Sequence, residues 1–93
     1  MRAAIITEPG GPDVLKIMEV DDPAPGPEDV LVDVKATALN RADTLQRQGN
    51  YAVPPGIPSD IPGLEFAGVV LEAGERVIGI AKGDRVFGLV GGG

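Results

Sequence analysis

The sequence predicts a small, mainly β domain, either a barrel or a sandwich, with one short helix. Three observations indicate this fold class. A clear stretch of alternating residues near position 30 has the two-residue period of a half-buried strand, and several short apolar runs repeat it more weakly. The 14 glycines and 9 prolines gather between these runs, which is typical of turns. Several short strands separated by regular turn signals favour a barrel or a sandwich.

The clearest strand is expected over Val30–Thr37. Its even-numbered positions are Val or Ala, whereas the odd-numbered ones include Asp33 and Lys35, so one face is expected to be buried. Weaker alternation predicts five further strands: Arg2–Thr7, Val14–Val20, Phe66–Glu72, Val77–Ile80 and Arg85–Val90. The turn clusters between the runs are Pro9–Pro12, Pro23–Pro27, Pro54–Gly63 and Gly91–Gly93.

One segment has the signals of a helix. Asn40 is a good N-cap, and the carboxylate of Asp43 can reach back to the backbone of the cap. Ala42 and Leu45 supply an apolar edge, and Gly49 is a plausible stop at the carboxyl end. The sequence therefore predicts a short helix between Asn40 and Gly49.

Composition excludes several classes of function. Eight basic and 14 acidic residues leave a net charge of −6, which argues against binding nucleic acid or an anionic membrane surface. No apolar run approaches the ~20 residues of a membrane span. The apolar patch in Met1–Thr7 is too short for a signal peptide, so a cytoplasmic protein is expected. Because cysteine and histidine are absent, disulfides, thiolate metal sites and the commonest zinc ligand are excluded.

The chain length of 93 residues suits one domain, spanning residues 1–93. Three glycines directly after the last predicted strand would leave a terminus that is neither capped nor packed, so either these residues are a flexible tail or the chain stops inside a longer protein; the resemblance described below favours the second. No stretch fits the G-x-G-x-x-G turn between a strand and a helix. A site for a dinucleotide pyrophosphate is therefore not expected within these residues.

Three segments carry a resemblance: 38–51, 62–70 and 82–86. They resemble the amino-terminal domain of the medium-chain dehydrogenase/reductase superfamily. Gly10–Pro12, Asn40–Asp43 and Gln46–Gly49 followed by Tyr51 are similar to the quinone oxidoreductase branch, above all to the tumour-suppressor-inducible quinone oxidoreductases, relatives of zeta-crystallin. The likeness extends over essentially the whole chain in one register.

The resemblance implies a GroES-like, partly open β-barrel that precedes a Rossmann domain absent from this chain. It also implies NADPH as the hydride donor, a quinone as the acceptor and a homodimeric parent enzyme. Zinc-dependent relatives carry a Cys ligand at the position of Asn40 and a His ligand at the position of Leu64. An amide and an aliphatic side chain do not replace these ligands, and Glu65 cannot hold zinc alone, so no metal is expected.

Without zinc, another group must polarise the carbonyl that accepts hydride. The resemblance places Tyr51 at the nicotinamide and substrate cleft, where its phenol could donate a hydrogen bond to the developing oxyanion. Asn40 could orient the nicotinamide or the substrate, and Asp43, Leu64 and Glu65 would line the cleft.

Plainer roles remain open for each of these residues. Tyr51 could be a packed loop residue, Asn40 a helix cap, Asp43 the partner of that cap and Glu65 an anchor for a loop. Arg41 and Arg47 are expected to be solvated helix charges, although either could meet a cofactor phosphate.

An alternative from another class is a ring-forming co-chaperonin without enzymatic activity. Such proteins share the barrel and a Gly-Asp-x-Val turn like Gly83–Val86. A capped helix and a proline-rich loop stand between Ala38 and Gly63, where a co-chaperonin needs a flexible apolar loop. This segment argues against the alternative.

Overall fold

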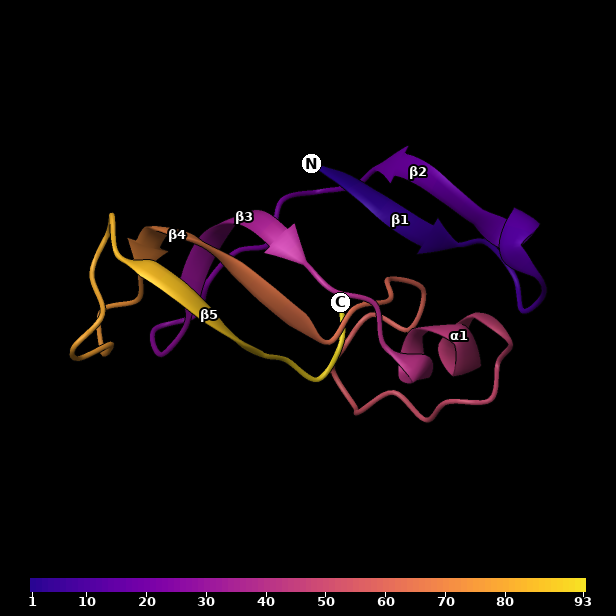
Figure 1. The fold of residues 1–93 in the computed structure, drawn as a ribbon. Coiled ribbons are helices and arrows are strands. Elements are labelled where there is room, and N and C mark those ends of the chain that lie inside the picture. The colour runs from indigo at the N-terminus through magenta and orange to yellow at the C-terminus, as the bar shows by residue number, and fades with distance from the viewer. The chain divides into compact units, whose positions relative to one another are not determined.

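The computed structural model describes residues 1–93 and confirms a mainly β protein with a single short helix (Figure 1). Its elements are β1 (Arg2–Ile6), the 3₁₀ turn η1 (Pro12–Val14), β2 (Leu15–Glu19), β3 (Val30–Thr37), α1 (Arg41–Arg47), β4 (Glu65–Ala73) and β5 (Arg85–Leu89). The chain forms two compact units. Unit 1 contains Met1–Asp21, Ala38–Leu64 and Leu89–Gly93, and unit 2 contains Asp22–Thr37 and Glu65–Gly88.

In unit 1, β1 and β2 pair as an antiparallel hairpin, with Arg2 opposite Glu19 and Ile6 opposite Leu15. Ile6 is buried at the end of β1, whereas every residue of β2 is exposed. The predicted strand from Val14 begins one residue late, because Val14 closes η1 by donating its N–H to a carbonyl 3.2 Å away, that of Gly11. A proline at the first position of η1 favours this turn, since its φ is fixed and it has no N–H to satisfy.

Helix α1 begins and ends where the sequence predicts. Asn40 is its N-cap and forms a capping box with the residue three positions later. At the other end, Gly49 has a φ of 81°, which a residue with a side chain rarely adopts. The N–H of Gly49 donates to Gln46 O (3.0 Å) and that of Asn50 to Leu45 O (2.8 Å), the two bonds of a Schellman motif. The chain therefore leaves the helix sharply, into the segment that carries the candidate site.

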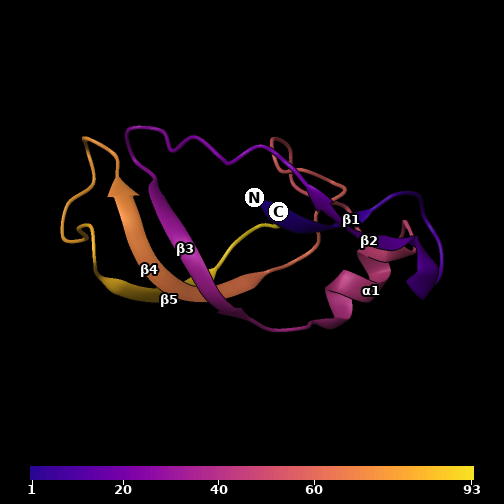
Figure 2. The same cartoon turned by 90° about the horizontal axis from the view of Figure 1, so that it is seen from above.

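The three strands of unit 2 form one sheet in the order β3-β4-β5. Strands β3 and β4 are antiparallel, and their register shifts twice, between Leu31 and Val32 and between Val34 and Ala36. Because each shift changes which side chains share a face, the alternation expected for β3 is lost. Its first four residues are half-buried and its last four exposed. Figure 2 shows how β4 curves along its length.

The predicted strand over Val77–Ile80 is wrong. The N–H of Val77 instead donates to the carbonyl oxygen of Gly74 at 3.0 Å and closes a turn. Gly79 has a φ of 85°, which extended backbone cannot have, and Ile78 is 94% exposed. Gly74 and Gly79 leave too few residues between them for a strand that pairs and buries a face. The other strand boundaries agree with the prediction to within one residue at each end.

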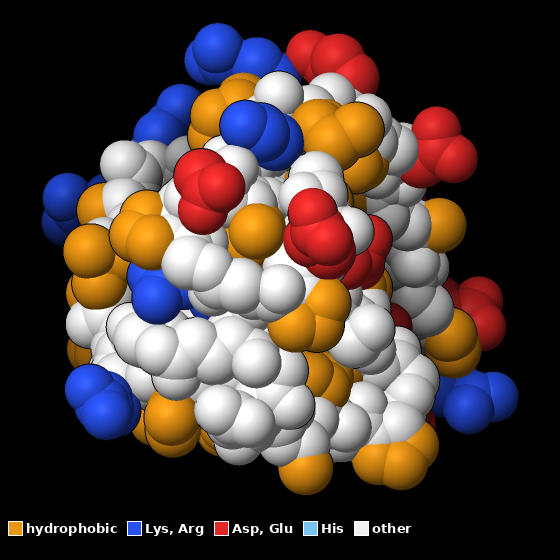
Figure 3. All heavy atoms as spheres, turned by 90° about the vertical axis from the view of Figure 1, so that its right-hand side faces the viewer, with side chains coloured by type: hydrophobic (Ala, Val, Ile, Leu, Met, Phe, Trp, Pro, Cys, Tyr) orange, Lys and Arg blue, Asp and Glu red, His pale blue; other side chains and the backbone are white.

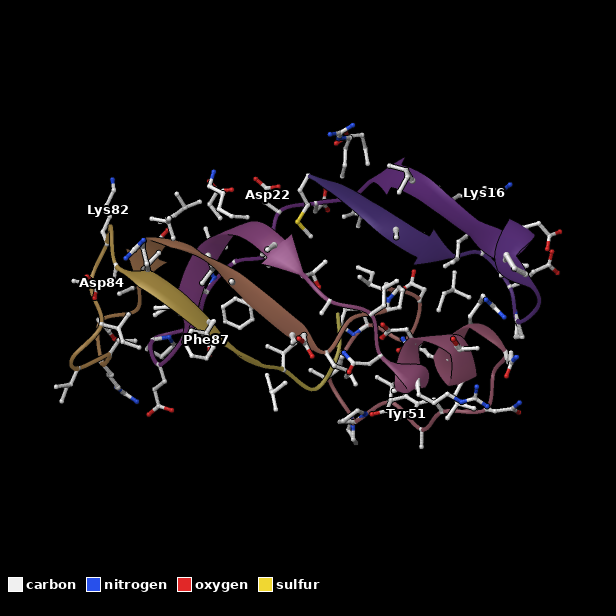
Figure 4. All side chains as sticks on the ribbon, viewed as in Figure 1. Lys16, Asp22, Tyr51, Lys82, Asp84 and Phe87 are labelled. Carbon is white, nitrogen blue, oxygen red and sulfur yellow. The ribbon has the colours of Figure 1, made fainter.

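Aspartates close two turns of unit 2. The carboxylate of Asp29 accepts the N–H of Gly26, and that of Asp84 accepts the N–H of Ala81, both at 2.9 Å. Lys82 and Asp84 lie in the turn before β5 (Figure 4). The Gly-Asp-x-Val signature that is shared with co-chaperonins therefore has a local structural purpose in this protein, since the Asp side chain replaces a backbone acceptor.

Gly68 of β4 has no room for a side chain beside β3. A Cβ atom at this position would overlap the carbonyl oxygen of Asp33 and lie 2.7 Å from Cγ1 of Val32. We expect Gly68→Ala to lower the free energy of unfolding by about 1–3 kcal/mol, because the two strands must separate. Chemical denaturation of the intact protein measures this change.

The matched control is Gly91→Ala, whose new Cβ would come no closer than 3.6 Å to any atom. The control is expected to change stability by less than about 0.5 kcal/mol. Equal stability of the two variants would contradict the described contact between β3 and β4.

Candidate functional site

Unit 1 contains an open pocket of about 420 Å³. Its wall comes from the end of β1 and the residues after it, from the last turn of α1, and from the segment that follows the helix. The apolar part of the lining is Ile6, Pro9, Tyr51 and Val53. A pocket of this size and lining can take one small, largely apolar ring system.

The polar part of the lining has a distinct charge. Thr7 and Ser59 are the lining residues with a hydroxyl group. Glu8 and Asp60 are the only charged residues among those that line the pocket. No Lys or Arg lines it. Two carboxylates and no cation repel anions, so the pocket favours an uncharged ligand over a phosphate group.

The surface of the protein is also acidic overall, with a net charge of −6. On the face drawn in Figure 3, blue basic and red acidic side chains are interspersed with apolar ones. No continuous basic patch crosses this face, so it offers no footprint for a nucleic acid backbone.

Tyr51 lies in the segment after α1, two residues beyond the glycine that ends the helix (Figure 4). The residue is half-buried and lines the pocket. Its hydroxyl makes no hydrogen bond to another residue of the chain, so the phenol is free to donate to a ligand. Of the five residues that the sequence predicts for the site, Tyr51 alone lines this pocket.

Asn40 and Asp43 have a structural task at the start of α1. The backbone N–H of Asn40 donates to Oδ2 of Asp43 at 2.8 Å, and the N–H of Asp43 donates to the carbonyl oxygen of Asn40 at 3.0 Å. The second carboxylate oxygen of Asp43, Oδ1, is buried and has no hydrogen-bond partner. A buried oxygen of this kind is costly unless a water or a ligand donates to it.

Leu64 and Glu65 stand at the start of β4. The carbonyl oxygen of Leu64 accepts the N–H of Val90 at 2.8 Å, and that of Glu65 accepts the hydroxyl of Thr37 at 2.7 Å. Leu64 belongs to unit 1 and Glu65 to unit 2. Nowhere in the chain do three or more His, Cys, Asp or Glu side chains form a group that could hold a metal ion.

Two residues of α1 have roles that the sequence analysis missed. Gln46, only 6% exposed, is the buried polar residue of the structure and lines the pocket. Arg47 is not a solvated charge: its Nε donates to the carbonyl oxygen of Gly10 at 3.1 Å, and the N–H of Gly10 donates back to Arg47 O at 3.0 Å. A hint was available for Gln46, because it precedes a proline-rich segment short of backbone donors.

Comparisons with known proteins agree with the fold. Residues 26–91 match the family described as alcohol dehydrogenase GroES-like domain. A quinone oxidoreductase of Lama guanicoe is 46% identical over 88 residues, which are 94% of this chain and 26% of that protein. The solved structure of the quinone oxidoreductase from Coxiella burnetii matches with a TM-score of 0.88 at 32% identity, over 98% of this chain and 30% of that one.

A third relative is a thermostable alcohol dehydrogenase from Pyrobaculum aerophilum, solved with cobalt and zinc bound. It is 44% identical with a TM-score of 0.81, covering 94% of this chain and 25% of its own. The chain thus spans about a quarter of the length of the curated relatives that it matches. No helix of the structure has the length and apolar character needed to cross a membrane.

The match over residues 26–91 covers more than half of the chain, and quinone oxidoreductases match nearly all of it. The order of strands and the single capped helix agree with this assignment. The chain belongs to the alcohol dehydrogenase GroES-like domain family, and it carries the amino-terminal domain of the medium-chain dehydrogenase/reductase oxidoreductases.

Proposed function

We propose that residues 1–93 form the substrate-binding part of a longer NADPH-dependent quinone oxidoreductase that works without zinc. The observation that carries this proposal is the pocket lined by Tyr51, whose hydroxyl has no partner in the protein. The quinone oxidoreductases among the relatives support the substrate class. They also favour an enzyme over the co-chaperonin alternative.

The proposed role of Tyr51 follows from the chemistry of a quinone. When a quinone carbonyl accepts a hydride, negative charge develops on its oxygen, and a phenol O–H within reach stabilises that charge. The apolar lining beside Tyr51 suits the flat, uncharged ring of a quinone. The two carboxylate residues in the lining, Glu8 and Asp60, disfavour anionic competitors.

The cofactor would be held mostly by residues outside this chain. NADPH supplies a hydride when bound, but its phosphates need a glycine-rich turn or basic side chains. These residues contain no G-x-G-x-x-G turn, and the pocket has no basic lining. We therefore propose that residues 1–93 alone neither bind NADPH tightly nor reduce quinones.

The other predicted site residues would act around the substrate. We propose that the side chain of Asn40 helps to orient the nicotinamide or the substrate in addition to its task at α1. Asp43, with one carboxylate oxygen buried and unpaired, would accept a hydrogen bond at the cleft. Leu64 and Glu65 would complete the cleft wall. We also propose that the full-length enzyme is a cytoplasmic homodimer.

Replacing Tyr51 tests the proposed mechanism. Tyr51→Phe removes the hydroxyl and keeps the ring, so the pocket wall should survive. Removing one oxyanion donor costs on the order of 10²-fold in turnover where the charge is localised. A quinone oxygen delocalises its charge, so we expect a loss in kcat of roughly 10-fold, about 1.4 kcal/mol.

The measurement is steady-state NADPH oxidation by the full-length protein with a simple para-quinone, at matched thermal stability. The loss should appear in kcat more than in KM, because the hydrogen bond strengthens in the transition state. A kcat within twofold of the parent would make Tyr51 a packed loop residue without a catalytic role.

Metal analysis tests the proposed independence from zinc. Asn40 and Leu64 occupy the two positions where zinc-dependent relatives carry ligands, and neither side chain replaces Cys or His. Purified full-length protein should therefore contain no stoichiometric zinc, and a strong chelator should leave its quinone reductase activity unchanged. One tightly bound zinc per chain, lost together with activity on chelation, would overturn this part of the proposal.

A further inference from the structure

Gln46 has an unusual position for a helical glutamine. It lies in the last turn of α1, lines the pocket of Tyr51 and is only 6% exposed. Burial of an amide is costly unless its polar atoms are hydrogen-bonded. Its Nε2 donates two bonds, to the carbonyl oxygen of Ser59 at 3.0 Å and to that of Ile61 at 3.3 Å.

The segment that accepts these bonds has few backbone N–H donors of its own. It contains four prolines between positions 54 and 62, and each proline removes a backbone N–H. The segment has no helix or strand of its own. Apart from one internal bond, from the N–H of Ile57 to the carbonyl oxygen of Pro54 at 3.2 Å, the carbonyl oxygens of the segment depend on donors from other residues or from water.

Three successive carbonyls of the segment obtain such donors. Gln46 serves the first and the third, those of Ser59 and Ile61. The second, that of Asp60, accepts the N–H of Ile6 at 2.7 Å, and Ile61 also accepts the N–H of Gly93 at 3.1 Å. One side chain thus links α1 to a segment that β1 and the last residues also hold.

We propose that Gln46 is a positioning residue for the substrate: it holds segment 59–61 as a wall of the pocket beside the part carried by β1, and so sets the shape that the quinone meets. Ser59 and Asp60 of this segment line the pocket directly. The chain then runs without a further helix or strand to Leu64, another residue proposed for the cleft. This inference rests on the proposed function for its substrate.

The test compares Gln46→Met with Gln48→Met in the full-length protein. The first substitution keeps the length of the side chain and removes both donated bonds. Gln48 caps the same helix, is exposed and makes no side-chain hydrogen bond, so the second substitution is the matched control. Gln46→Glu, which keeps the shape but presents a carboxylate to two carbonyls, is the second variant if Gln46→Met folds poorly.

Amide hydrogen exchange measures the positioning itself. In Gln46→Met the N–H groups of Ile6 and Gly93, which donate to the held segment, should exchange about 10-fold faster, because local opening becomes easier. Gln48→Met should leave both rates unchanged. Unchanged exchange at Ile6 and Gly93 in the Gln46 variants would overturn the inference, whatever the activity.

Steady-state kinetics measures the consequence for the substrate. We expect the quinone KM of Gln46→Met to rise about 10-fold while kcat stays within about threefold, because a displaced wall weakens binding rather than the chemical step. Faster exchange with an unchanged KM would mean that Gln46 only stabilises the fold, and would overturn the positioning role. A parent protein that reduces no quinone would refute the proposed function, and the exchange rates would still decide whether Gln46 holds the segment.

Discussion

The shortage of backbone donors between Pro54 and Pro62 is the constraint on which the arrangement of unit 1 depends. A segment with this many prolines cannot join a sheet, and its carbonyls still have to be paired. The side-chain amide of Gln46, in the last turn of α1, donates hydrogen bonds to two of these carbonyls, those of Ser59 and Ile61. The position of the helix is in turn determined by its capping box and by the Schellman motif at Gly49. The pocket is lined by the end of β1 and the residues after it, the last turn of α1 and the segment after the helix.

The chain has few aromatic residues with which to build a core. Its buried apolar residues are few: Ile5, Ile6, Val14 and Val70. Hydrogen bonds that involve loop residues therefore stabilise much of the local structure in unit 1, including the reciprocal pair between Arg47 of α1 and Gly10. In unit 2, Gly68 allows close contact between β4 and β3, because a Cβ atom at this position would overlap the carbonyl oxygen of Asp33.

Local signals in the sequence predicted the local structure well. The ends of α1 follow from Asn40, Asp43 and Gly49, because caps act over a few residues. Five strands were predicted to within one residue at each end, whereas the sixth, over Val77–Ile80, was wrong. Features that depend on distant residues were not predictable in this way. The register shifts of β3 depend on its partner strand, and the burial of Gln46 depends on a segment more than ten residues away.

The candidate site shows the same division. Tyr51 was predicted from a resemblance, and the structure adds that it lines a pocket and that its hydroxyl is unpaired. The structural roles weighed for Asn40 and Asp43 are present, at the start of α1. No local pattern distinguishes a glutamine that holds a loop from one that is solvated, so Gln46 and Gln48 look alike in the sequence although only Gln46 is buried.

The central claim is that the pocket of unit 1 receives a quinone carbonyl beside Tyr51. A crystal structure of the full-length protein with a bound, non-reacting quinone analogue tests it most directly. The account predicts one carbonyl oxygen of the analogue within about 3 Å of the Tyr51 hydroxyl, at hydrogen-bonding distance. An analogue bound elsewhere, with the Tyr51 hydroxyl facing water, would contradict the account.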